Sequence, residues 1–369
     1  METNATGGDD RRYPRNDQSW RSNRRDVIRL AAASMVASLT GGLHAAPVAA
    51  TTGAPIRRSN KPLRAAFSNI GLQVSWCAQG KEAAEFWGKL FNVDVTWFDP
   101  ELSATQQLAA VEEMASRDWD FVAIQAVEID TLVAPVNRMI DAGIPVIDMD
   151  TLIAPLDQIG VHTFLAPDNE FMGAAVTEAL VKAIGGVGTI IMTQGALGHT
   201  GAQGRARGFE SVIAQHPNIE VLATEPADWD PAKVVQLWES YLVTYPNISA
   251  AFFHNDDMAL AALEVMRARN RTEILIGGVD AMPPAIRAVV DGSMYATVRN
   301  SSCRIHGGAI VAGVDAALAP KKTPAAPPRQ PHTSPATNLK SLSRAPVSRT
   351  FSALAQRESF ANGTCGVDN

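Results

Sequence analysis

The chain has 369 residues, of which 46% are hydrophobic and 19% charged, and its formal net charge at pH 7 is −6. This length allows two sizeable hydrophobic cores, and the negative charge argues against nucleic acid as a partner, because duplex binding depends on clustered Lys and Arg. Cys77, Cys303 and Cys365 are too few and too scattered for a disulfide framework or a zinc motif, so we expect free thiols.

The first 50 residues predict an export signal. The segment Ser22-Asn23-Arg24-Arg25-Asp26-Val27-Ile28-Arg29 leads into an apolar, Ala-rich run over residues 30–39. This run is too short to span a bilayer, and small residues suited to cleavage follow it. We therefore expect residues 1–50 to be a twin-arginine-type signal peptide, residues 51–61 a linker, and the mature protein periplasmic. The alternative is a basic, disordered tail beside a chance Ala-rich helix.

From Leu63 onward, short apolar runs alternate with amphipathic ones, which is typical of βα units that build a parallel sheet. In the first series we expect strands at 63–67, 93–98, 121–125 and 145–149. The helical patterns between them lie at 76–90, 105–116 and 131–142.

A second series begins with an expected strand at 162–166. Further strands are expected at 189–192, 220–224, 250–253, 273–278 and 295–298, and helices at 171–184, 202–216, 231–245, 258–268 and 284–291. A last helix, 305–318, is expected to return to the first lobe. The fold class is therefore α/β, with two similar doubly wound parallel-sheet lobes.

The segment from Ala319 onward changes composition abruptly to Pro, Ser, Thr, Ala and basic residues. Such a segment lacks the bulky apolar side chains needed for a core, so residues 320–369 are predicted to be a disordered tail.

Polar residues follow several of the expected strands directly. In AAFFHNDDMALAA, residues 250–262, the apolar run stops at His254-Asn255-Asp256-Asp257 and a helical pattern begins at Met258. Asn or Asp at such a position can cap the next helix, and in open α/β sheets the same edge holds ligands. Because the chain repeats this arrangement several times, we expect a ligand site at these strand ends.

The chain resembles the periplasmic sugar-binding proteins of the ribose-binding type, the solute receptors of bacterial ABC importers. The segments that carry the resemblance are Gly143-Ile144-Pro145-Val146-Ile147-Asp148-Met149-Asp150, Ala166-Pro167-Asp168-Asn169, Arg205-Ala206-Arg207-Gly208-Phe209, Pro226-Ala227-Asp228-Trp229-Asp230, His254-Asn255-Asp256-Asp257-Met258-Ala259 and Gly278-Val279-Asp280. The resemblance covers about residues 62–318. The resemblance implies a first lobe of residues 62–167 plus 301–319 and a second lobe of residues 168–300, joined by crossover segments with a ligand cleft between them.

The resemblance also implies the ligand-binding residues, which are Trp76, Asp150, Asn169, Arg205, Trp229, Asn255, Asp280 and Asn300. These residue types suit sugar hydroxyls, which need carboxylate acceptors, amides that donate and accept, an Arg fork and aromatic faces. Thr151 stands where ribose-binding members have Arg, and Asn300 stands where Gln is common. The missing Arg makes ribose itself doubtful, and Asn300 shortens the reach across the crossover by one methylene. Two carboxylates, Asp150 and Asp280, against one Arg205 favour a neutral monosaccharide or sugar alcohol.

Other functions were weighed against a receptor for an ABC importer. A lac-repressor-type regulator needs an N-terminal helix-turn-helix, which residues 1–60 lack, and we find no phosphate loop, nucleophile elbow or paired metal ligands for an enzyme. We therefore expect no catalytic residue, no metal and no cofactor. The expected partners are a small neutral sugar or polyol and an ABC transporter permease, with no nucleic acid and a monomeric state. A sensor that presents bound sugar to a chemoreceptor or kinase stays an alternative.

Overall fold

The computed structural model describes residues 59–319 of the chain. The predicted signal peptide, most of the predicted linker, the predicted tail and Cys365 lie outside this range. Within it every predicted strand and helix is present, with ends displaced by at most three residues. The apolar periodicity of these segments is therefore sufficient to locate the elements.

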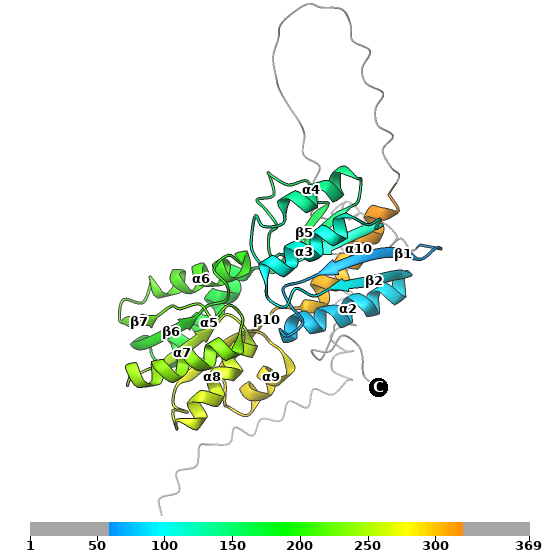
Figure 1. Cartoon of the computed structure of the whole chain (residues 1–369). Helices are drawn as coiled ribbons and strands as arrows, with labels where there is room; N and C mark the ends of the chain where they lie inside the picture. Colours follow the sequence, from blue (N-terminus) through cyan, green and yellow to red (C-terminus); the bar gives the residue numbers. More distant parts are fainter. Residues whose placement is uncertain (1–58, 320–369) are drawn as a thin grey trace, which may run out of the picture. The chain divides into compact units, whose positions relative to one another are not determined.

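The first lobe contains a parallel five-stranded sheet in the order β2-β1-β3-β4-β5 (Figure 1). Helices connect β1, β2, β3 and β4 in turn, and β5 follows β4 with no helix between them. The last helix of the described range packs against α2, β3, β4 and β5. The elements are β1 (Leu63–Ser68), α2 (Ser75–Phe91), β2 (Val93–Phe98), α3 (Ala104–Ala115), β3 (Phe121–Ile124), α4 (Val133–Asp141), β4 (Val146–Met149), β5 (Thr163–Leu165) and α10 (Ser302–Ala317).

Strand β5 belongs to the first sheet. It is the strand expected at 162–166 as the start of the second series, although the expected lobe boundary at residue 167 placed it in the first lobe. It pairs with β4, and the Asp150 N–H donates to the Leu165 carbonyl at 2.7 Å. An apolar run shows that a strand exists, whereas the sheet it joins depends on the path of the loop before it.

The second lobe contains a second parallel sheet in the order β10-β9-β8-β6-β7 (Figure 1). Its elements are α5 (Asn169–Ala183), β6 (Gly188–Thr193), α6 (Thr200–Ile213), β7 (Ile219–Ala223), α7 (Pro231–Thr244), β8 (Ala250–Phe253), α8 (Asp256–Ala268), β9 (Leu275–Asp280), α9 (Pro283–Val290) and β10 (Ala296–Arg299). The chain passes between the lobes at residues 166–168 and 300–301. Strand β10 is the last strand within residues 59–319.

Helices α5 and α6 pack closely because glycines lie at their contact. A Cβ atom on Gly208 would lie 2.1 Å from the Glu170 carbonyl oxygen, and one on Gly173 would lie 2.1 Å from the Arg205 carbonyl oxygen. Any side chain larger than hydrogen would therefore force the two backbones apart. This close packing fixes the position of the α6 turn that carries Arg205.

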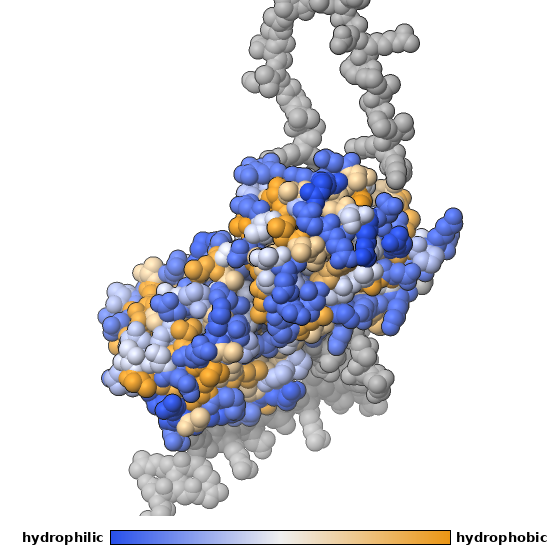
Figure 2. All heavy atoms as spheres, in the orientation of Figure 1, coloured by the Kyte–Doolittle hydropathy of each residue, from blue (hydrophilic) through white to orange (hydrophobic). Residues whose placement is uncertain are grey.

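The strands that lead to the predicted site are buried along their whole length. All four residues of β3, of β4 and of β8 are inaccessible to solvent, as expected for parallel strands with helices on both faces. On the face shown in Figure 2, hydrophobic residues lie in groups between hydrophilic ones, which is the ordinary character of a folded surface. No helix within residues 59–319 is long and apolar enough to cross a membrane.

The cysteines differ from expectation at one position. Cys77 is free and buried, as predicted, but Cys303 in α10 is disulfide-bonded. The prediction of free thiols rested on spacing in the sequence, whereas a disulfide depends on the distance between the two residues in the folded chain.

Candidate ligand-binding site

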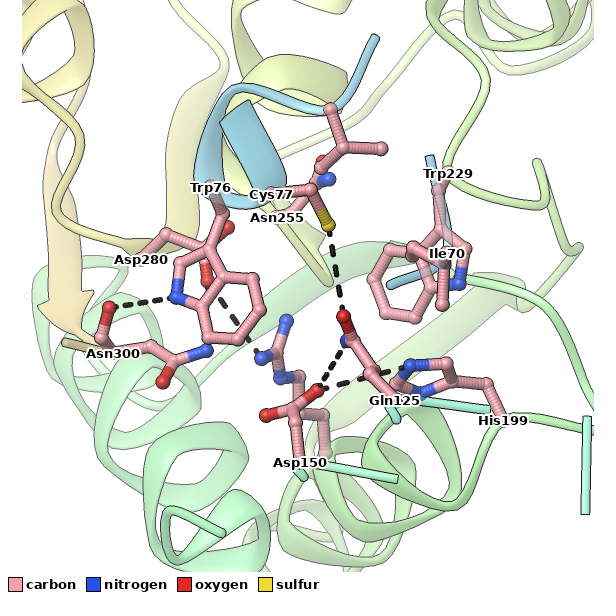
Figure 3. A pocket seen from close by; sticks show the side chains of 12 residues that line it. Ile70, Trp76, Cys77, Gln125, Asp150, His199, Trp229, Asn255, Asp280 and Asn300 are labelled. Carbon is pink, nitrogen blue, oxygen red and sulfur yellow. Dashed lines mark hydrogen bonds and ion pairs between the residues drawn. The ribbon is translucent and has the colours of Figure 1, made fainter. Parts of the chain in front are cut away.

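Polar side chains converge where the parallel strands of both lobes end (Figure 3). Asp150 follows β4, Asn255 follows β8 and Asp280 ends β9, and all three side chains are buried. They line one cavity together with residues from the helices and loops that follow the strands. The full lining is Ile70, Val74, Trp76, Cys77, Gln125, Asp150, His199, Arg205, Trp229, Asn255, Asp280 and Asn300.

Of the eight predicted site residues, seven line this cavity and Asn169 lies behind it. The Asn169 Oδ1 accepts a hydrogen bond from the Arg205 Nε at 3.0 Å. The same guanidinium donates to the His254 carbonyl and lies 3.7 Å from Asp280 Oδ1. Asn169 therefore orients the arginine.

Arg205 is the cation of the cavity lining, and its guanidinium contacts both polar and aromatic neighbours. It lies 5.6 Å from the ring centre of Trp229, within the range of a cation–π interaction. The arginine is only 3% exposed. Its charge is therefore shared between Asp280, two hydrogen-bond acceptors and an aromatic face.

Asp150 is held by Gln125, a residue that the sequence analysis did not select. The Gln125 Nε2 donates to Asp150 Oδ2 at 2.9 Å, and the Gln125 Oε1 lies 3.7 Å from the thiol of Cys77 (Figure 3). Gln125 directly follows β3. The rule that selected Asp150 and Asn255, a polar residue at the carboxyl end of a buried strand, would also have selected Gln125.

Two tryptophans form apolar walls of the cavity. The Trp76 Nε1 donates to the Asn300 carbonyl at 2.9 Å, so this ring is fixed against the second crossover. The Trp229 ring packs edge-on against His199, with 4.9 Å between ring centres. Aromatic walls of this kind suit the C–H faces of a small polar ligand.

Three lining residues have backbone angles that side chains rarely adopt. The φ angles are 57° at Asp150, 65° at Trp229 and 118° at Asp280. Positive φ is uncommon outside glycine, and such strain tends to cluster at functional sites. The coincidence of strain and cavity supports a binding role for these residues.

The cavity disfavours unpaired charge. Burial raises the pKa of the Asp280 carboxyl well above its usual range, against the opposing effect of Arg205. Burial likewise raises the pKa of Asp150, although Arg205 and the hydrogen bond from Gln125 lower it. For His199, burial and the nearby Arg205 lower the pKa to about 3, so its imidazole is neutral.

Four buried polar atoms of the lining have no hydrogen-bond partner within residues 59–319. They are the donors Trp229 Nε1 and Asn255 Nδ2 and the acceptors Asp150 Oδ1 and Asn300 Oδ1. Asn255 combines two roles, because its Oδ1 accepts from the Met258 N–H and caps α8 while its Nδ2 stays unpaired. An unsatisfied buried polar group costs about 1–3 kcal/mol, so these atoms favour a ligand that can donate and accept.

The lobes are closed around a small cavity. Its volume is about 20 Å³, which is enough for one water molecule. Hydrogen bonds join the lobes on both sides of it, from Ser75 to Asp257 and from Leu152 to Thr200. A larger ligand can therefore enter only when the lobes move apart.

His199, Ile70, Val74 and Cys77 line the cavity but were not predicted to do so. The structure places the ring of His199 in the cavity wall. These residues lie in loops or first helical turns, where apolar periodicity carries no information about side-chain direction. No group of three or more His, Cys, Asp or Glu side chains within residues 59–319 is placed to hold a metal ion.

Comparison with known proteins agrees with this geometry. Over residues 65–317 the chain matches the family described as periplasmic binding protein domain. The chain belongs to this family, and it is of the ribose-binding type.

Its relatives are named for the solutes they bind. The xylitol-binding protein of Mycolicibacterium smegmatis is 28% identical over 249 residues, which cover 66% of this chain and 70% of the relative. The ribose import binding protein of Salmonella typhimurium is 28% identical over 218 residues, which cover 59% of this chain and 72% of that relative. An ABC transporter solute binding protein from Bacillus halodurans with bound myo-inositol has a TM-score of 0.66 and 26% identity, covering 70% of this chain and 90% of that one.

Proposed function

We propose that the protein is an extracytoplasmic receptor that binds a neutral monosaccharide or sugar alcohol and delivers it to an ABC importer. The observation that carries this proposal is the set of four unpaired polar atoms in the cavity wall, two donors and two acceptors. Each hydroxyl of a sugar both donates and accepts, so one polyol can satisfy all four. The tryptophan walls support the same ligand class.

The charges of the site favour a neutral ligand. Asp150 and Asp280 oppose the single Arg205 cation of the lining, and Arg205 is already surrounded by acceptors. A phosphate or sugar acid would meet two carboxyl groups in a closed cavity and would find no unpaired cation among the lining residues. Burying such an unpaired charge costs several kcal/mol.

A panel of pentoses, hexoses and sugar alcohols, with phosphorylated sugars as the anionic comparison, tests the ligand class by thermal shift. A ligand at 1,000 times its dissociation constant stabilises a protein by roughly 4 kcal/mol, which a melting curve resolves easily. Tighter binding of phosphorylated sugars than of neutral ones would overturn the proposal.

The variant Asp280→Ala tests the site itself. We expect it to abolish the fluorescence response of Trp229 to ligand, because donors of the ligand lose an acceptor and Arg205 loses its ion-pair partner. Asp141→Ala, which changes an exposed carboxylate in α4, is the matched control and should bind as the parent does. Binding by Asp280→Ala at the affinity of the parent would contradict the assignment.

Delivery to an importer is supported by the relatives, which include an import binding protein and an ABC transporter solute binding protein. Genes for a permease and an ATPase beside the gene of this protein would favour import. Ligand uptake that persists in cells lacking this protein would argue against it.

A further inference from the structure

His199 and Thr151 form a hydrogen-bonded pair that joins the two lobes beside the cavity. Thr151 directly follows Asp150 in the first lobe, and His199 immediately precedes α6 in the second. The His199 Nε2 and the Thr151 Oγ1 are 2.5 Å apart, and both side chains are buried. The pair therefore bridges the two lobes, and His199 is part of the cavity lining.

The contacts of the imidazole define which nitrogen carries the proton. The His199 Nδ1 accepts a hydrogen bond from the Ala202 N–H at 3.3 Å and so caps α6. A ring nitrogen that accepts carries no proton, so the proton of the neutral ring is on Nε2. Burial keeps the ring neutral, with a pKa of about 3. Nε2–H is thus a donor that points to the first lobe, and Thr151 Oγ1 is its acceptor.

The pair lies next to groups that we assign to the ligand. The His199 Nε2 is 3.8 Å from Asp150 Oδ2, which is too long for a hydrogen bond, and Asp150 Oδ1 has no partner within residues 59–319. The same ring forms an edge contact with Trp229 (Figure 3). Asp150 Oδ2, which accepts from Gln125, faces the imidazole, so a ligand hydroxyl on Oδ1 would lie on the same carboxyl group as the oxygen that His199 faces.

The size of the cavity requires this pair to separate when a ligand enters. The closed cavity of about 20 Å³ has room for one water molecule, whereas a sugar has many more non-hydrogen atoms. A hydroxyl oxygen placed between the parted side chains can accept from His199 Nε2–H and donate to Thr151 Oγ1. Neither side chain is then left with an unpaired polar atom, which would weaken binding.

We propose that His199 is a specificity-determining residue that, together with Thr151, holds one ligand hydroxyl beside the hydroxyl held by Asp150. The site therefore selects ligands with hydroxyl groups on two neighbouring carbon atoms. This inference rests on the proposed function and adds to it a direct ligand contact at a position that the sequence pattern did not mark.

The alternative is that His199 only caps α6, and one substitution separates the two roles. Asn is among the best N-cap residues, so His199→Asn keeps an acceptor for the first turn of α6. Its side chain is too short to place a donor where Nε2 lies. A capping role alone therefore predicts no change in ligand preference, whereas a ligand contact predicts a selective one.

Calorimetric titration of the exported protein tests the contact, with D-ribose, xylitol, myo-inositol and their mono-deoxy analogues as probes. For the probe that binds most tightly, we expect one deoxy analogue to bind the parent protein about tenfold more weakly, since it leaves a buried donor unpaired. His199→Asn should bind this analogue and its parent sugar with equal affinity. The other deoxy analogues should keep their full penalty in the variant.

Two results would overturn the inference, and they are distinguishable. If a probe binds but every deoxy analogue has the same penalty in the parent protein and in His199→Asn, the ligand contact is wrong while the proposed function stands. If no neutral probe binds the parent protein, the proposed function fails and the inference fails with it.

Thr151→Val provides a second variant if His199→Asn does not fold. It removes the hydroxyl and keeps the shape of the side chain, and it leaves the α6 cap untouched. The same deoxy analogue should lose part of its penalty in Thr151→Val. An unchanged penalty there would count against the inference equally. Thermal unfolding of each ligand-free variant establishes that it is folded before the titration.

Discussion

A contact outside the cavity predicts how tightly the closed form is held. Asp257 in α8 of the second lobe accepts two hydrogen bonds from Ser75 in α2 of the first, from the backbone N–H at 2.8 Å and from the hydroxyl at 2.6 Å. Val74, the N-cap residue of α2, makes no side-chain cap. The carboxylate therefore supplies the cap from the other lobe, where the positive end of the helix dipole also favours it.

The variant Asp257→Ala removes both hydrogen bonds at once. A hydrogen bond to a charged group contributes about 1.5–3 kcal/mol when buried, and these two are only partly buried, so we expect the closed form to lose about 2 kcal/mol. That free energy corresponds to roughly a 30-fold change in an equilibrium constant. Ser75→Ala removes only the hydroxyl bond, so its effect should be smaller, about fivefold.

Stopped-flow measurement of ligand dissociation is the direct assay, because the ligand can leave only when the lobes part. Asp257→Ala should release every ligand about 30-fold faster and should leave the order of ligand preference unchanged. Glu264→Ala, which removes an exposed carboxylate of the same helix, is the matched control. A dissociation rate for Asp257→Ala equal to that of the parent would refute the reasoning.

Three further predictions concern stability and processing. Burial raises the pKa of Asp148 to about 8 from a usual 3.8, so the folded protein keeps a proton there that the unfolded chain releases, and stability falls as pH rises toward 8. The buried histidines have lowered pKa values and make stability rise with pH, but only below about pH 6.5. The melting temperature should therefore fall from pH 6.5 to pH 8, and it should fall less in Asp148→Asn. The same fall in the variant and in the parent protein would contradict this. Gly208→Ala should lower the free energy of unfolding by about 1–3 kcal/mol in denaturant unfolding. Gly160→Ala is the control and should not, because a Cβ atom there would lie 3.7 Å from its nearest neighbour. Equal denaturation midpoints for the two variants would refute the close α5–α6 contact. N-terminal sequencing of periplasmic protein should find a start between about residues 46 and 54, and retention of residues 1–40 would disprove the predicted signal peptide.

The polar residues at strand ends could be predicted from the sequence because one physical rule governs them. Parallel strands present their carboxyl ends at one edge, so Asp150, Asn255 and Asp280 had to lie near one another once the strands were located. Gln125 obeys the same rule and was overlooked. Asn169 was placed in the site on resemblance, but the structure shows it behind Arg205, where it accepts the Nε hydrogen bond.

His199 could not be located by the same reasoning. It precedes a helix rather than ending a strand, and its ring reaches the cavity only because the lobes close onto each other. Local patterns predict which segments fold, whereas contacts between lobes depend on how the segments are brought together. For the same reason Cys303, which is disulfide-bonded, could not be distinguished from Cys77 by spacing.

The strained turn at Asp280 shows how the site keeps its shape before a ligand arrives. Asp280 and Ala281 both have positive φ, a conformation that costs on the order of 1–3 kcal/mol per residue unless neighbours enforce it. Asp256 enforces it, because its carboxylate accepts from the Met282 N–H at 2.7 Å and from the Thr297 hydroxyl at 2.7 Å. The Thr297 Oγ1 in turn accepts from the Ala281 N–H at 3.1 Å.

The residues of this network belong to one lobe, from α8, β9, β10 and the loop after β9. Opening the lobes therefore breaks the Ser75 and Thr151 contacts with the opposite lobe but leaves the carboxylate of Asp280 aimed in the same direction. The ligand meets a preformed half of its site and does not have to order it, which reduces the entropy lost on binding. A strained turn that is held by hydrogen bonds within its own lobe, together with contacts between lobes that break on opening, allows a site that is rigid toward its ligand and still able to open.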